Sequence, residues 1–179
     1  YKGIFTILSS CASRQLEEVT FRRTVIPVQE LLDAAGKYFK KSMKNRSERI
    51  ELEIEPMEAK VIGDVNQLRF LLENLIDEAL TVREDGLIRL QARQDNEYIR
   101  FLFTDTRREK SVEELNQLFY PNLARMTSGE KGELRGTEYL ICKQIIRDHD
   151  EFAGRRGCRI NAEPAEGGGF TVYFTIPRR

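Results

Sequence analysis

The chain has 179 residues, which is enough for one domain with a sizeable core and a short appendage. Apolar residues make up 40% of the chain and charged residues 32%, as in an ordinary globular protein. The 29 basic and 29 acidic side chains cancel, so the net positive charge that drives binding to nucleic acids or anionic membranes is missing. We therefore expect no nucleic-acid partner and no direct membrane contact by this chain.

The first 19 residues carry apolar side chains at helical spacing, which predicts the end of a longer helix that starts before Tyr1. Residues 21–26 favour an extended segment, and Pro27 suits the first turn of a second helix that runs to about Ser42. No apolar run approaches the ~20 residues that cross a bilayer; a sensor attached to a membrane would have to lie upstream. The first stripe consists of Ile4, Phe5, Leu8, Cys11, Ala12, Leu16 and Val19.

Alternation of apolar and polar residues predicts several half-buried strands further along the chain. Asp95 and Asn96 suit a hairpin turn between two of them, and the last strand alternates most strictly. The strands are expected at residues 50–54, 88–92, 99–103, 158–162 and 170–176.

Residues 64–83 predict the helix around which the rest of the chain is organised. Asp64 can cap its first turn, and Gln67, three residues on, can complete a capping box. Asn74 and Glu78 stand four residues apart, so their side chains project from one face of the helix. The opposite face is an apolar stripe of Val65, Leu68, Leu72, Leu75, Ile76 and Ala79.

The second half of the chain predicts a short helix at residues 112–119 and an amphipathic helix at 139–149, separated by a glycine-rich, charged loop at 126–136. Strands and helices are mixed without regular βαβ alternation. This order favours an α+β fold, a two-layer α/β sandwich in which helices cover one face of a mixed, mostly antiparallel sheet. The expected core includes Leu72, Leu75, Phe101, Phe103, Ile145, Val172 and Phe174.

Cysteine and histidine usage limits the chemistry that the chain can perform. Cys11, Cys142 and Cys158 form neither a C-x-x-C pair nor an even set, so we expect buried thiols in a reducing compartment, the cytoplasm. His149 is the single histidine, which excludes most histidine-based metal sites and hydrolase triads. It is followed by Asp150, Glu151 and Phe152, but the proline typical of a phospho-acceptor motif is missing, so we expect a structural role.

Several short motifs follow one another in a specific order. Residues 74–79 read N-L-I-D-E-A, Asp105 ends a strand, and E-x-L-x-x-x-F-x-P runs from Glu113 to Pro121. Gly136 then precedes I-C-K-Q at residues 141–144, and a glycine turn precedes the final strand. Over residues 21–177 this order resembles the ATP-binding domain of sensor histidine kinases, whose Bergerat-type ATPase fold is shared with DNA gyrase, the Hsp90 chaperones and MutL.

The resemblance implies a role for each matching position. Asp105 would accept a hydrogen bond from the adenine amino group, and Glu78 stands where the family has an asparagine that binds magnesium. Gly136 would open the helix that holds the phosphates. The candidate cofactor-binding residues are thus Asn74, Glu78, Asp105, Arg107, Gly136 and Thr137, with Glu78 as the candidate Mg²⁺ ligand and with Asn74 and Glu78 as the catalytic candidates if the site is active.

Five positions depart from the family pattern, and all five would contact the ligand. Glu78 replaces the magnesium-binding asparagine, Arg107 and Glu109 replace the glycines that follow Asp105, and Leu134 and Glu138 replace glycines of the phosphate loop. Glycines there let the backbone approach the nucleotide and expose bare N–H groups to phosphate. The resemblance therefore implies a degenerate pocket in which ATP and Mg²⁺ bind weakly or not at all.

The favoured function is the ATPase-like domain of a two-component sensor protein, a pseudokinase that signals through contacts with a dimerisation hairpin, of the same or a partner kinase, and with a response regulator. An active kinase is the alternative, because the carboxylate of Glu78 is a good ligand for Mg²⁺ and a histidine outside this chain would receive the phosphate. A serine kinase such as an anti-sigma factor is a third candidate, which the helix at residues 1–19 disfavours.

Two further expectations concern organisation and the pocket. Residues 1–19 would be the C-terminal end of a dimerisation or linker helix, residues 20–179 the ATPase-like domain, and the full-length protein a dimer. Because a pocket without its ligand must be filled, we expect Arg107 or Arg108 to turn inward and pair with Glu78 or Glu138.

Overall fold

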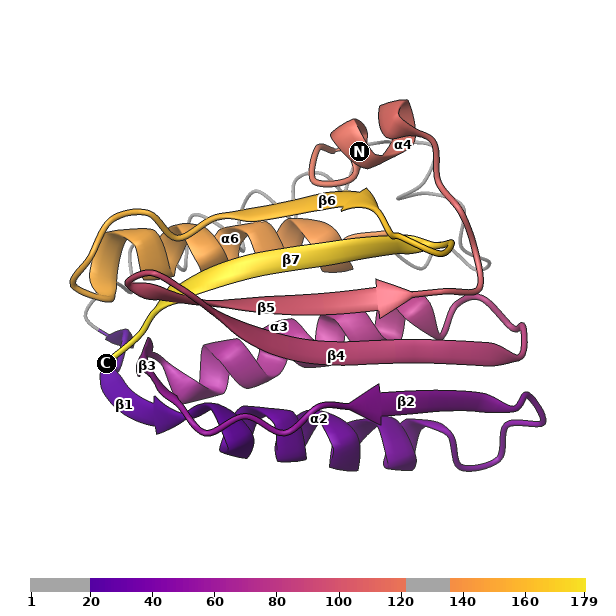
Figure 1. Cartoon of the computed structure of the whole chain (residues 1–179), viewed down its shortest axis with the longest axis horizontal. Coiled ribbons are helices and arrows are strands. Elements are labelled where there is room, and N and C mark those ends of the chain that lie inside the picture. The colour runs from indigo at the N-terminus through magenta and orange to yellow at the C-terminus, as the bar shows by residue number, and fades with distance from the viewer. Residues whose placement is uncertain (1–19, 122–135) are drawn as a thin grey trace.

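The computed structural model describes residues 20–121 and 136–179. Strands form a sheet in front of a layer of helices (Figure 1). The elements are β1 (Thr24–Pro27), α2 (Val28–Ser42), β2 (Ile50–Ile54), β3 (Lys60–Gly63), α3 (Val65–Ala79), β4 (Gly86–Asp95), β5 (Tyr98–Asp105), α4 (Val112–Gln117), α6 (Glu138–Phe152), β6 (Ile160–Pro164) and β7 (Phe170–Pro177).

The main sheet has five strands in the order β2-β4-β5-β7-β6. β2 pairs with β4 in parallel, and the other neighbouring strands pair antiparallel. β1 and β3 form a separate two-stranded antiparallel sheet. α2, α3 and α6 lie behind the main sheet in Figure 1 and cover one of its faces. The expected α+β class, with a mixed and mostly antiparallel sheet covered by helices on one face, is confirmed.

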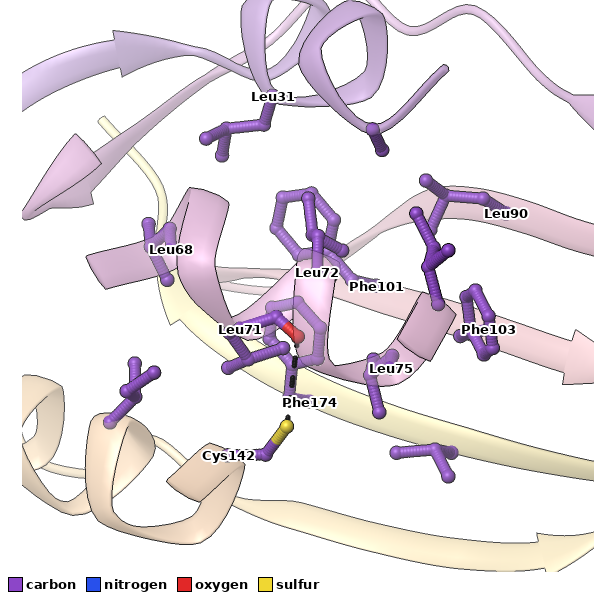
Figure 2. Packing of buried hydrophobic residues seen from close by; sticks show 14 of the residues in the cluster. Leu31, Leu68, Leu71, Leu72, Leu75, Leu90, Phe101, Phe103, Cys142 and Phe174 are labelled. Atoms are coloured by element: carbon purple, nitrogen blue, oxygen red, sulfur yellow. Dashed lines mark hydrogen bonds between the residues drawn. The ribbon is translucent and has the colours of Figure 1, made fainter. Parts of the chain in front are cut away.

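α3 is the central helix of its layer, in contact with α2 on one side and α6 on the other. Figure 2 shows its leucines packed over Phe101 and Phe174, whose rings stack with centroids 4.8 Å apart and planes 7° apart. The thiol of Cys142, on α6, donates a hydrogen bond to the Leu71 carbonyl at 3.6 Å. All seven residues expected in the core are buried.

The expected hairpin joins β4 and β5. Asp95 pairs with Tyr98, and Asn96, between them, has φ 54°, a backbone conformation that asparagine tolerates in tight turns. The last strand, β7, differs from its sequence pattern, because Thr171 and Thr175 are buried as well as its apolar residues. β7 lies between β5 and β6, and the hydroxyls of both threonines are hydrogen-bonded, Thr171 with Thr104 at 2.7 Å and Thr175 to the Gly157 carbonyl at 3.2 Å.

The structure corrects two details of the helix starts. Pro27 ends β1 and precedes α2 instead of lying within it. Asp64 caps α3 as expected, accepting hydrogen bonds from the N–H groups of Asn66 and Gln67. The reciprocal half of the capping box is wrong, because the Asp64 N–H donates to His149 Nε2 at 3.1 Å.

The helix expected at residues 1–19 and most of the loop expected at 126–136 lie outside the described residues. The short helix expected at residues 112–119 ends earlier, at Gln117. Within residues 20–121 and 136–179, no helix combines the length and the apolar character needed to cross a lipid bilayer.

Candidate functional site

Arg107 is a deeply buried residue among those that depart from the family pattern and that the structure describes. It follows the end of β5 by two positions, and only 1% of its side chain is exposed. Its Nε donates to Asp105 Oδ1 at 2.9 Å and its Nη2 to Asp105 Oδ2 at 2.8 Å. The guanidinium thus binds both oxygens of the Asp105 carboxylate, in the bidentate geometry that makes arginine–carboxylate pairs strong.

The remaining donors of Arg107 bind backbone carbonyl groups of the last residue of α3 and of the turn that follows the helix. Nη2 also donates to Ala79 at 2.6 Å, and Nη1 donates to Val82 at 2.9 Å and Glu84 at 3.0 Å. A guanidinium has five N–H bonds, and each of them has an acceptor here. The last carbonyls of a helix lack partners within the helix and carry negative partial charge, so this cation stabilises the C-terminal end of α3.

Asp105, the candidate adenine acceptor, is buried with 4% of its surface exposed. Its Oδ1 accepts from the backbone N–H of Arg107 at 3.0 Å in addition to Nε. Both carboxylate oxygens are therefore engaged by Arg107. In this arrangement the group that would receive an adenine amino group is already hydrogen-bonded and charge-paired within the chain.

Two glycines make room for this pair. Gly86, at the start of β4, has φ +146°, and a Cβ there would lie 2.5 Å from Arg107 Cγ. Gly169, just before β7, has φ +83°, and a Cβ there would lie 2.1 Å from the Asp105 carbonyl oxygen. Since side chains rarely adopt such φ values and neither position has space for one, both glycines are required by the packing around Asp105 and Arg107.

Arg108 behaves differently from its neighbour. Its side chain is 58% exposed, and its Nε lies 3.5 Å from Glu84 Oε2 at the surface. The expectation that one of the two arginines turns inward is therefore correct for Arg107. The expected partner is wrong, because Arg107 pairs with Asp105 and with backbone carbonyls instead of Glu78 or Glu138.

The other side of the candidate site is acidic. Glu138 is the first residue of α6, and its Oε2 is buried with no hydrogen-bond partner among the described residues. Burial raises the pKa of Asp77, and the Glu138 carboxylate raises it further. Burial likewise raises the pKa of the Cys142 thiol, with Glu138 and Glu78 adding to the shift. The carboxylates of α3 and α6 are thus close enough to interact, and their field opposes the binding of phosphate.

The remaining candidate residues are distributed around these groups. Asn74, on α3, is buried, and its Nδ2 donates to the Phe70 carbonyl at 2.7 Å. Glu78, one turn further on, is partly exposed. Gly136 has φ +77°, which explains why a glycine persists there. Thr137 is the N-cap of α6 but makes no side-chain capping bond. Leu134 lies outside the described residues.

Two carboxylates bear on how a nucleotide would fit this arrangement. The Asp105 carboxylate is held by Arg107, and the Glu138 carboxylate stands at the helix start where a phosphate would need N–H donors. Glu78 has the oxygen ligand chemistry that Mg²⁺ prefers. In the described ranges, however, no three histidine, cysteine or acidic side chains lie together in a way that could hold a metal ion.

Sequence reasoning missed the carbonyls of Ala79, Val82 and Glu84 and the glycines that accommodate Arg107. Gly86 at the start of β4 was the available signal, because glycine in a strand often marks a close approach of another group. Nothing in the sequence indicates which group approaches.

Comparison with known proteins places these features in a family. The model of the histidine kinase-, DNA gyrase B- and HSP90-like ATPase family matches residues 63–179. No curated protein matches the chain in sequence.

Solved structures of similar fold are catalytic parts of histidine kinases. The nucleotide-free catalytic domain of histidine kinase ThkA has a TM-score of 0.68 and 21% identity, covering 88% of this chain and 97% of that one. The mycobacterial sensor histidine kinase MprB has a TM-score of 0.67 and 20% identity, covering 88% and 99%. Histidine kinase AdeS of Acinetobacter baumannii has a TM-score of 0.65 and 13% identity, covering 97% and 76%. At these identities the likeness supports the fold.

Proposed function

This chain belongs to the histidine kinase-, DNA gyrase B- and HSP90-like ATPase family, and from that membership we propose that it is the ATPase-like domain of a two-component sensor protein whose nucleotide site is degenerate. It acts as a pseudokinase, passing a signal through protein contacts instead of phosphoryl transfer. The observation that carries the proposal is the saturated, buried guanidinium of Arg107 on Asp105.

Displacing this guanidinium would be costly. ATP would have to compete with Arg107 for Asp105, and moving the guanidinium would remove the Arg107 donor from the carbonyls of Val82 and Glu84 and one of the two donors from that of Ala79. Breaking a buried ion pair typically costs about 3–5 kcal/mol, which raises a dissociation constant by about two to three and a half orders of magnitude. A site that would otherwise bind ATP at about 1 μM would therefore weaken to the millimolar range, and we expect no ATP binding tighter than about 1 mM.

The phosphate end of the site supports the same conclusion. Glu138 places a carboxylate in the first turn of α6, and Leu134 replaces a glycine of the preceding loop. The negative charges of a carboxylate and a triphosphate repel each other in a partly buried setting. A magnesium ion would reduce this repulsion, and its candidate ligand is Glu78.

The partners follow from the family and the order of the chain. Residues 1–19 would be the end of a dimerisation hairpin, and residues 20–179 would be the ATPase-like domain. The domain would lie in the cytoplasm, where it could be attached to a membrane-spanning sensor upstream, and the full-length protein would be a dimer. A response regulator is the second partner. The fold neighbour ThkA has been solved in complex with the response regulator protein TrrA, with a TM-score of 0.67 and 19% identity over 99% of this chain and 49% of that one.

Calorimetric titration of the purified protein with ATP and Mg²⁺ tests the proposal. The unchanged protein should have a dissociation constant for ATP of about 1 mM or weaker. Arg107→Gly restores the family glycine and frees Asp105, so it should bind more tightly than the parent, provided that circular dichroism shows it folded. Arg108→Gly is the matched control, because its side chain is exposed, and it should leave binding unchanged.

An active kinase is the second candidate, favoured by the position of Asn74 and Glu78 one turn apart on α3. In that case Glu78 and Asn74 would hold Mg²⁺, and a histidine outside this chain would receive the phosphate. A micromolar dissociation constant for the unchanged protein, lost in Asp105→Asn, would select this function and overturn the pseudokinase.

A further inference from the structure

β2 is an edge strand of the main sheet, and within residues 20–121 and 136–179 the backbone groups along its outer edge have no hydrogen-bond partner. Gly86 N donates to the Arg49 carbonyl at 3.0 Å, and Glu55 N donates to the Leu90 carbonyl at 3.1 Å. A parallel ladder uses every second residue of a strand, so residues 49, 51, 53 and 55 bond to β4. The N–H and C=O groups of the alternate residues must point away from the sheet; these residues are Ile50, Leu52 and Ile54.

A groove of about 870 Å³ runs along this edge, between β2 and α2. Its lining combines the apolar side chains of Phe39, Leu52 and Ile54 with charged residues on both walls: Asp33, Lys37 and Lys40 on α2, and Glu51 and Glu53 on β2. Gly36 lets α2 approach β2 closely, since a Cβ there would lie 3.1 Å from Ile54 Cδ1. A second hollow of about 640 Å³ continues it past Pro56 to residue 60.

We propose that this groove binds an extended segment of a partner protein, which adds to the sheet as a further strand beside β2 and alternates apolar with basic residues. Backbone groups of Ile50, Leu52 and Ile54 supply the hydrogen bonds, as in other complexes formed by strand addition. The five residues of β2 span about 17 Å, so a partner segment of five to seven residues fills the edge.

The side chains of β2 determine which partner residues fit. Leu52 and Ile54 point to the helix layer and pack against the core, so partner residues on that face should be apolar. Glu51 and Glu53 lie on the opposite face, and both are exposed along the same groove. Glu53 shares an exposed ion pair with Arg89 at 3.5 Å, and Glu51 has no ion-pair partner among the described residues. Lysine or arginine on this face of the partner would meet both carboxylates.

A second copy of this chain fits the edge less well. Antiparallel pairing of two β2 strands about Leu52 would place Glu51 of one copy opposite Glu53 of the other. Like charges directly opposite each other destabilise a strand pair. The β2 edge should therefore bind a basic segment more tightly than it binds the β2 strand of a second copy. The other edge of the sheet, β6, differs because α4 packs beside it (Figure 1).

A designed peptide can test this site on the intact 179-residue chain. The probe is an acetylated and amidated heptapeptide that alternates lysine with valine, followed by amide NMR and calorimetry. We expect the amides of Ile50, Leu52 and Ile54, which should exchange fast in the free protein, to become protected when the peptide binds. A peptide of the same composition with its valines grouped together should bind about tenfold more weakly, because it cannot present one apolar and one basic face.

Charge reversal gives the matched comparison. Glu51→Lys combined with Glu53→Lys should weaken the lysine–valine peptide roughly tenfold and favour a glutamate–valine peptide instead. Glu163→Lys, an exposed change on the opposite edge strand β6, should change nothing.

Several results would overturn the proposal. One is that the grouped peptide binds as tightly as the alternating peptide. Another is that Glu163→Lys weakens peptide binding as much as the double variant Glu51→Lys with Glu53→Lys. A third is that the peptide protects only amides outside β2. Absence of binding up to about 1 mM peptide would also overturn it. Concentration-dependent protection of the Leu52 amide without peptide would show that a second copy occupies the edge.

Discussion

The backbone N–H of Asp64 donates to Nε2 of His149 at 3.1 Å, and this bond joins the start of α3 to the last turn of α6. Because Nε2 accepts, the ring proton must lie on Nδ1, which donates to the Ile145 carbonyl at 2.8 Å. The ring is fully buried, and a Cβ on Gly63 would lie 2.8 Å from it. This geometry accounts for His149 as a structural residue, as its sequence context indicates.

His149→Ala should lower the free energy of unfolding by about 2–4 kcal/mol. The variant removes a buried ring and leaves the Asp64 N–H without its acceptor. Urea unfolding at neutral pH measures the loss. Arg147→Ala, an exposed position on the same helix, should change stability by less than about 0.5 kcal/mol. Equal effects in the two variants would contradict a structural role for His149.

Patterns that depend on neighbouring residues predicted the fold well. Strict alternation located β2, β4 and β5, and the Asp95-Asn96 pair located their hairpin, because side-chain period and turn conformation are local properties. The apolar stripe through Leu72 and Leu75 likewise located the buried face of α3.

Features that depend on distant residues were not predictable. The sequence indicates a half-buried strand at residues 50–54, but that β2 is a sheet edge with an open groove follows only from strand order. The partners of Arg107 could not be predicted either, because they also depend on residues that are distant in the sequence. A long side chain reaches many acceptors, and the carbonyls at the end of α3 become its partners only once the turn before β4 brings them close.

The central helix gives a direct test of the core. Leu75→Ala should cost about 2–5 kcal/mol, because it removes a fully buried side chain and leaves a cavity. Phe70, on the same helix, is 45% exposed, so Phe70→Ala should cost much less. Chemical denaturation of both variants provides the comparison, and a Phe70→Ala loss as large as that of Leu75→Ala would argue against the described orientation of α3.

The buried thiols should resist modification in the folded protein. Burial and the nearby Asp150 carboxylate raise the pKa of Cys158 to about 12, and burial raises that of Cys142 as well. At pH 8 a thiol with this pKa is only about one part in ten thousand ionised, and the thiolate is the reactive form.

A thiol reagent that absorbs light on reaction checks this expectation in a Cys11→Ser background, which removes the cysteine outside the described residues. Both thiols should react within minutes in denaturant and far more slowly without it. The same raised pKa makes stability fall as pH rises from about 9 towards 12, because the unfolded thiol ionises first. Fast reaction of the folded protein at pH 8 would refute the described burial.

The pair formed by Arg107 and Asp105 should couple strongly in a double-mutant cycle. Arg107→Met keeps the volume of the side chain but leaves the Asp105 carboxylate buried without its cation, so we expect a loss of about 3–5 kcal/mol. Asp105→Asn should be similarly harmful, since it leaves the guanidinium uncompensated.

Combining the two changes removes both charges, so the double variant should be more stable than the sum of the single losses implies, by about 2–3 kcal/mol. Arg108→Met is the matched control, and because its ion pair with Glu84 is exposed it should change stability by less than about 1 kcal/mol. Additive losses in the cycle would mean that Arg107 is held by the α3 carbonyls alone. Asp105 would then keep the freedom to accept another donor, and the argument from this carboxylate for a degenerate site would lose its basis.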